Sequence, residues 1–194
     1  VIVMTLAAAG SARAEMVWDP PWVENPSDPQ WAGGVVTHQR WEFSEDPSFP
    51  VSARNPFGQP FVEVSGTYPD IVIGSDGETP IPTWHIDQDG QGLAIYVPNN
   101  PLPNARKVIF IQLTSDKGPL FGNPTSSPGG TVTYPKGPIK HGPTSWYTYT
   151  AQIEIPFNPA EEYVFYSFHE STNISEIVVD TICVPEPASL VLLG

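Results

Sequence analysis

Cysteine and basic residues are both scarce in this sequence. One cysteine, Cys183, stands among 194 residues, so the chain cannot form an internal disulfide. The residues around Cys183 suggest no base that would activate it, and we expect it to be a small buried residue. Only 8 Lys and Arg oppose 21 Asp and Glu, and they form no cluster. Because nucleic-acid binding depends on basic side chains that neutralise phosphates, nucleic acid is excluded as a partner.

Helical periodicity and long apolar runs are missing as well. No segment repeats its apolar residues with the 3.6-residue period of a helix, and no apolar run reaches the roughly 20 residues of a membrane span. Short runs rich in β-branched and aromatic residues predict strands instead. The segment 147–155 alternates strictly, as half-buried antiparallel strands do, and 106–114 is apolar on both faces. We therefore predict an all-β fold, an antiparallel, jelly-roll-like β-sandwich between flexible N- and C-terminal tails.

Turn-forming residues give three local predictions. The proline-rich segment 15–34 is expected to be extended, because proline interrupts regular helices and strands. An Asp-Gly pair at 89–90 is expected to join strands 83–88 and 91–97 as a hairpin. Asn158, which precedes a proline, is expected to cap a short helical turn.

The last residues of the chain carry a short motif. Val184, Pro185, Glu186, Pro187 and Ala188 are followed by apolar residues up to the end of the sequence. This stretch resembles the start of the PEP-CTERM sorting signal of Gram-negative bacteria that produce exopolysaccharide. The resemblance implies processing by an exosortase, and a membrane helix with a basic cluster beyond the given sequence. That missing helix would be the only contact with a membrane. The motif predicts a location and leaves the activity open.

The first residues of the chain predict export. An apolar run over 1–9 precedes small residues at Ala12 and Ala14, the two positions that signal peptidase inspects. Cleavage is therefore expected between Ala14 and Glu15. The predicted organisation is a signal-peptide remnant over 1–14, a β-sandwich ectodomain over 15–183 and a truncated sorting signal over 184–194. Such a protein would reach the cell surface or the extracellular matrix.

A weak calcium signal lies in the same Asp-Gly region. Asp87 and Asp89 alternate as in a calcium loop, and Gly92 occupies the sixth position from Asp87. The twelfth position, where an EF-hand needs glutamate, is Pro98. A turn explains the same residues. A structural calcium therefore remains an alternative to the expectation that the protein needs no cofactor.

Catalytic motifs are scarce. The sequence has no nucleophile elbow for acyl transfer and no phosphate-binding glycine loop. Two carboxylates facing each other across a cleft would suit glycan hydrolysis, but Glu161 and Glu162 are adjacent and would point to opposite faces of a strand. We predict a non-catalytic protein, with a secreted glycan hydrolase as the less favoured alternative.

Aromatic residues offer a second function. Sugar-binding proteins stack aromatic rings on pyranose faces, and Trp22, Trp31, Trp146 and Tyr147 are the candidates here, although large aromatics also fill sandwich cores. The first hypothesis is thus a surface or matrix protein associated with exopolysaccharide. The alternative is a lectin-like module that binds carbohydrate through exposed Trp and Tyr, which a planar row of exposed rings would favour.

Overall fold

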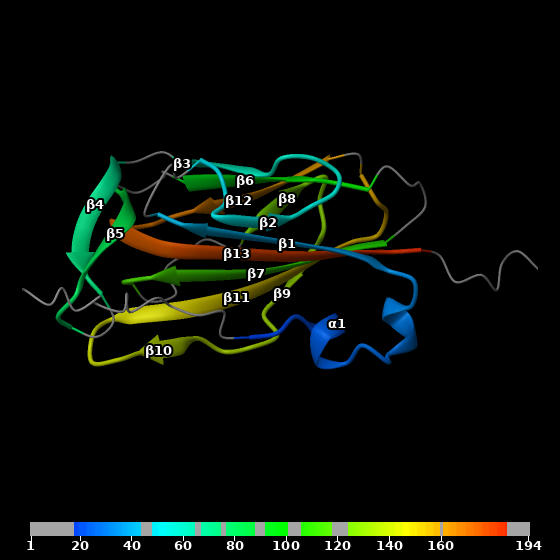
Figure 1. Cartoon of the computed structure of the whole chain (residues 1–194), viewed down its shortest axis with the longest axis horizontal. Helices are drawn as coiled ribbons and strands as arrows, with labels where there is room; N and C mark the ends of the chain where they lie inside the picture. The colour runs from blue at the N-terminus through cyan, green and yellow to red at the C-terminus, as the bar shows by residue number, and fades with distance from the viewer. Residues whose placement is uncertain are drawn as a thin grey trace, which may run out of the picture.

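Thirteen strands in the described residues form two antiparallel sheets, as the computed structural model shows (Figure 1). The structure describes residues 18–43, 48–64, 67–74, 77–87, 92–100, 106–117, 124–159 and 161–185. The strands are β1 Val35–Glu42, β2 Ser52–Arg54, β3 Phe61–Val64, β4 Thr67–Ile73, β5 Pro80–Ile86, β6 Gly92–Pro98, β7 Arg106–Ser115, β8 Thr125–Ser127, β9 Thr131–Thr133, β10 Ile139–His141, β11 Trp146–Ile155, β12 Glu161–Ser167 and β13 Thr172–Val184. Several residues named above lie outside the described part: Ala12, Ala14, Glu15, Asp89, Glu186, Pro187 and Ala188.

The larger sheet has nine strands: six follow the path β10-β11-β7-β13-β1-β2, β9 also pairs with β11, and β5 pairs with both β13 and β4. The smaller sheet has the order β3-β6-β12-β8. The predicted antiparallel β-sandwich is therefore confirmed, although its sheets of nine and four strands are less equal than those of an eight-stranded jelly roll. The strand β13 extends one residue past the expected domain boundary, through Val184.

The central strand β7 is buried on both faces, as its apolar sequence predicts. Ile109 and Ile111 belong to the main core, which includes buried residues of both sheets. Val108 and Phe110 alternate with them and belong to a second cluster on the outer face of the larger sheet. The larger sheet is therefore covered on both sides around β7.

The proline-rich leading segment supplies the cover for that outer face, and its predicted extended form is wrong. It contains one helical turn, α1 Pro21–Glu24, and a 3₁₀ turn at Pro29–Trp31. Both turns begin with proline at the first helical position, where the missing N–H has no helical partner to lose and the fixed φ suits a helix. In the part of the chain that the structure describes, no helix has the length and hydropathy to span a bilayer.

The predicted hairpin between β5 and β6 is also wrong. The strands exist, but β5 pairs with β4 and β13 in the larger sheet, whereas β6 pairs with β3 and β12 in the smaller one. The connection crosses from sheet to sheet. Pairing with the long strand β13 outweighs the local turn preference.

The predicted helical turn after Asn158 is replaced by the start of β12 at Glu161. The side-chain amide of Asn158 donates a hydrogen bond to the Asn100 carbonyl. An asparagine that caps a helix would instead accept a hydrogen bond from the backbone N–H two or three residues later.

Gly92 allows the close approach of β6 and β12. A Cβ built there would lie 2.2 Å from the Tyr166 carbonyl oxygen, a backbone atom that cannot rotate away. We expect Gly92→Ala to lower the free energy of unfolding by about 1–3 kcal/mol, as overpacking does. Denaturant unfolding measures this. Gly137→Ala is the control, because a Cβ there meets nothing within 4 Å, and a similar loss in both variants would contradict the prediction.

Candidate functional site

Four aromatic rings form a continuous row on the outer face of the smaller sheet. Phe61 of β3 stacks on Tyr96 of β6, with ring centroids 4.8 Å apart. Tyr96 contacts Tyr163 of β12 at 5.1 Å, and Tyr163 stacks on Phe165 at 6.0 Å with the two planes 13° apart. We call these four residues the aromatic row. It crosses three neighbouring strands, since Phe61, Tyr96 and Tyr163 are directly opposite one another in the register.

Strand alternation explains why these rings point outward. On β6, Leu93, Ile95 and Val97 are buried in the core, so Tyr96 between them faces the other side. On β12, Val164 and Tyr166 are buried and the residues between and before them face out. The outward ring of Phe165 is 40% exposed.

Polar side chains border the aromatic row. Glu63 lies beyond Phe61 on β3, and Glu161 precedes Tyr163 on β12; both are exposed. Burial, followed by the charge and hydrogen bond of Glu161, raises the pKa of Tyr96. Two hydroxyl residues of β8 lie opposite Tyr163 and Phe165, respectively Ser127 and Thr125. Flat apolar rings with carboxylates and hydroxyls at their border are the chemistry that a sugar ring needs.

The tryptophans that the sequence offers as candidates lie elsewhere. Trp22 and Trp31 are only 6% and 9% exposed and pack edge to face at 5.7 Å in the second cluster. Trp146 is 2% exposed and donates to the Ile73 carbonyl. All three are therefore core rings, the alternative that the sequence left open for large aromatics in a sandwich. Tyr147 is half-buried beside Tyr149 on β11, a strand of the larger sheet, whereas the aromatic row lies on the smaller one.

The alternation of residues along β6 and β12 is the sequence pattern that predicts the surface rings. Once Leu93, Ile95 and Val97 are assigned to the core, the alternation leaves Tyr96 on the surface. The same argument places Phe165 there. Aromatic residues alternating with aliphatic ones in strands predict surface rings better than tryptophans in loops do here.

The calcium prediction remains open, because one of its two ligands lies outside the described residues. Asp87 is exposed and pairs with His85, Oδ1 to Nε2, at 3.2 Å. Across the described ranges, no three acidic, histidine or cysteine side chains are grouped as a metal site.

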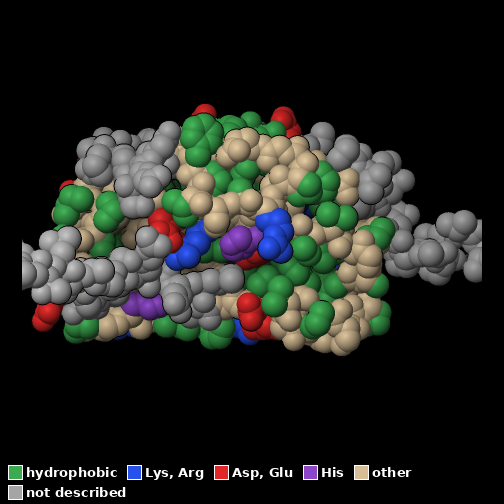
Figure 2. Space-filling model, in the orientation of Figure 1, with side chains coloured by type: hydrophobic (Ala, Val, Ile, Leu, Met, Phe, Trp, Pro, Cys, Tyr) green, Lys and Arg blue, Asp and Glu red, His purple; other side chains and the backbone are tan. Residues whose placement is uncertain are grey.

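Charged side chains of β1 and β13 pair with one another on the outer face of the larger sheet. Figure 2 shows basic and histidine side chains near the middle of this face, with carboxylates beside them. His38 Nδ1 lies 2.7 Å from Asp180 Oδ1, and Arg40 pairs with both Glu42 and Glu176. Among the described residues, these charges are therefore paired within β1 and between β1 and β13.

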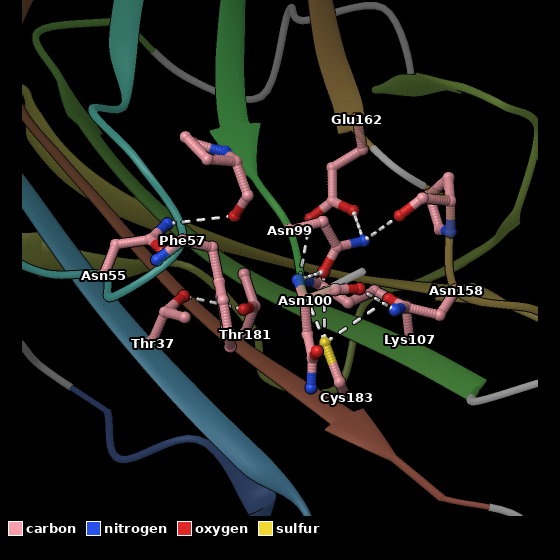
Figure 3. A network of polar contacts seen from close by, with 12 residues as sticks. Thr37, Asn55, Phe57, Asn99, Asn100, Lys107, Asn158, Glu162, Thr181 and Cys183 are labelled. Carbon is pink, nitrogen blue, oxygen red and sulfur yellow. Dashed lines mark hydrogen bonds and ion pairs between the residues drawn. The ribbon is translucent and has the colours of Figure 1, made fainter. Parts of the chain in front are cut away.

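A cluster of polar side chains is buried between the two sheets, at the end of the sandwich where β13 ends. Lys107 Nζ at the start of β7 lies 3.0 Å from Glu162 Oε1 on β12, and both side chains are 0% exposed. Asn99, after β6, lies between them, as Figure 3 shows. Cys183 of β13 is buried in the same network, which confirms its predicted burial. We call these four residues the buried network.

Glu161 and Glu162 point to opposite faces of β12, as predicted. Glu161 is exposed beside the aromatic row, whereas Glu162 is in the buried network. Burial raises the pKa of Glu162, and Lys107 opposes that shift. The two carboxylates therefore cannot flank one glycosidic bond.

Comparisons with known proteins supply no family: no family model matches the chain, and no curated protein matches it.

Proposed function

We propose that this chain is an exported, non-catalytic surface or matrix protein whose sandwich binds glycan through the aromatic row. The observation that carries the proposal is the stacked row of Phe61, Tyr96, Tyr163 and Phe165, which crosses three strands of one sheet. A rigid strand scaffold holds these rings in place, so little conformational freedom is lost when a ligand stacks on them.

The border of the row favours a neutral polysaccharide. Glu63 and Glu161 place carboxylates beside the rings, and the whole chain has a net charge of −13. Like charges oppose the approach of an anionic polymer. Neutral sugar hydroxyls can instead donate hydrogen bonds to these carboxylates.

The terminal motifs support the location. Ala12 and Ala14 resemble a signal-peptidase site, and Pro185-Glu186-Pro187 resembles an exosortase substrate of a Gram-negative bacterium. Exopolysaccharide would then be the glycan present where the protein is delivered. Signal peptidase and exosortase are the proposed partners during export.

Replacing one exposed ring of the row tests glycan binding. We expect Phe165→Ala to weaken binding to neutral exopolysaccharide fragments at least tenfold, or about 1.4 kcal/mol, because the sugar loses one stacking surface. Isothermal titration or a glycan array measures this on the purified chain.

The matched control is Phe157→Ala. Phe157 is 45% exposed, close to the 40% of Phe165, and lies outside the row. Its replacement should leave binding unchanged, and Tyr163→Phe should retain most of it because the ring remains. Equal losses in both phenylalanine variants, or wild-type protein that binds no neutral glycan, would contradict the proposal.

A further inference from the structure

The buried network brings an amine, an amide and a carboxyl group into mutual contact. Lys107 Nζ donates to Asn99 Oδ1 at 2.7 Å, and Asn99 Nδ2 donates to Glu162 Oε2 at 2.8 Å. The other carboxylate oxygen, Glu162 Oε1, lies 3.0 Å from the lysine nitrogen. One carboxyl group therefore touches both the amine and the amide nitrogen.

The side-chain carbonyl of Asn99 is polarised by further donors. The backbone N–H of Asn100 donates to Asn99 Oδ1 at 2.9 Å, and the thiol of Cys183 donates to the same oxygen at 3.1 Å. Donors at this distance stabilise the negative charge that develops on a carbonyl oxygen under nucleophilic attack. The amide carbon, one bond beyond this oxygen, is thus made electrophilic next to the lysine nitrogen.

From this contact geometry we infer that Lys107 and Asn99 condense into an intramolecular amide bond, with Glu162 moving the protons. The lone pair of Nζ forms the new bond to Cγ of Asn99, and the Cγ–Nδ2 bond breaks. Nδ2 leaves as ammonia with one proton from the Glu162 carboxyl group, which in turn takes one proton from Nζ. The carboxyl group ends as it began, so no oxidant, metal or cofactor is needed.

Burial prepares the reactants for this step. The attacking amine must be neutral, and the carboxyl group must carry the proton. Transfer of the lysine proton to Glu162 removes two opposite charges from a site with no solvent exposure, where charged groups are costly. The raised pKa of Glu162 favours the same protonation state.

The bond would connect the two sheets covalently. Asn99 follows β6 of the smaller sheet, and Lys107 lies in β7 of the larger sheet. A chain with one cysteine has no disulfide for this purpose. The inference is independent of glycan binding, since the network lies inside the sandwich and the aromatic row lies outside it.

Peptide mapping of the folded, purified chain tests the bond. Trypsin cuts after Arg54, Arg106, Lys107 and Lys117, so an unmodified chain releases Asn99 and Lys107 in separate peptides. We expect peptides 55–106 and 107–117 to remain joined, with no cut after Lys107. Their joint mass should be lower than the sum of the two peptide masses by one ammonia. Separate peptides from the folded protein would overturn the inference.

Three variants assign the atoms. Glu162→Gln should abolish the joined peptide, because it cannot exchange the protons. Asn99→Asp should give a joined peptide of the same mass as wild type, since loss of water replaces loss of ammonia. Asn158→Asp is the control for a neighbouring asparagine and should leave the joined peptide unchanged. A joined peptide in Glu162→Gln, or one that contains residue 158, would overturn the assignment.

Discussion

Lys107→Met is expected to lower the free energy of unfolding by about 3–5 kcal/mol, the cost of breaking a buried ion pair from one side. The variant leaves Glu162 in the core without its basic partner, and Asn99 Oδ1 loses its closest donor. The reference for this value is the chain in which Lys107 and Asn99 are still unjoined, because the proposed amide bond removes the lysine charge. Denaturant unfolding followed by tryptophan fluorescence measures the change.

The same substitution at an exposed pair is the control. Lys136 Nζ lies 2.9 Å from Glu24 Oε1, but these side chains are 30% and 40% exposed. An exposed pair contributes only about 0–1 kcal/mol, so Lys136→Met should cost little. Equal effects at 107 and 136 would show that burial does not decide the cost.

The double variant Lys107→Met with Glu162→Leu separates the effect of the unpaired charge from the effect of altered packing. Removing both charged groups leaves no uncompensated charge, and apolar replacements of buried pairs are often neutral or stabilising. We therefore expect the double variant to be more stable than Lys107→Met alone. A further loss would mean that packing, and not the orphaned charge, explains the single variant.

The fold could be predicted because its strands follow simple patterns. β7 reads as apolar on both faces, and both faces are buried. Residues of β1 alternate between inward and outward positions even where they are polar. Thr37 faces inward, and its hydroxyl is hydrogen-bonded to that of Thr181 at 2.7 Å. What the patterns could not supply was sheet membership: β5 and β6 are neighbours in sequence but belong to different sheets.

The candidate sites were harder to predict because they depend on tertiary contacts. Trp22 and Trp31 resemble surface rings in a proline-rich segment, yet that segment folds back on the larger sheet and buries them. The aromatic row was predictable from alternation only after the inward face of β6 and β12 was known. Nothing in the spacing of Asn99, Lys107 and Glu162 reveals their meeting, which depends on how the two sheets are packed.

Trp41→Ala is expected to be among the most destabilising single changes in the core. Trp41 lies on β1 opposite Ile177 of β13 and is 0% exposed. Removing a buried tryptophan side chain costs about 3–5 kcal/mol, through lost apolar burial and the cavity that remains. The midpoint of denaturant unfolding should fall accordingly, with the slope unchanged if the variant still unfolds in two states.

Trp41→Phe shows whether volume or polarity dominates at this position. The indole N–H of Trp41 has no hydrogen-bond partner among the described residues, and a buried donor left without one costs about 1–3 kcal/mol. Phenylalanine removes that donor and keeps most of the ring, so its loss should be well below that of alanine. Val36→Ala, at a 45% exposed position on the same strand, should change stability by no more than about 0.5 kcal/mol. If phenylalanine and alanine destabilise equally, the indole N–H must have a partner that contributes to the fold.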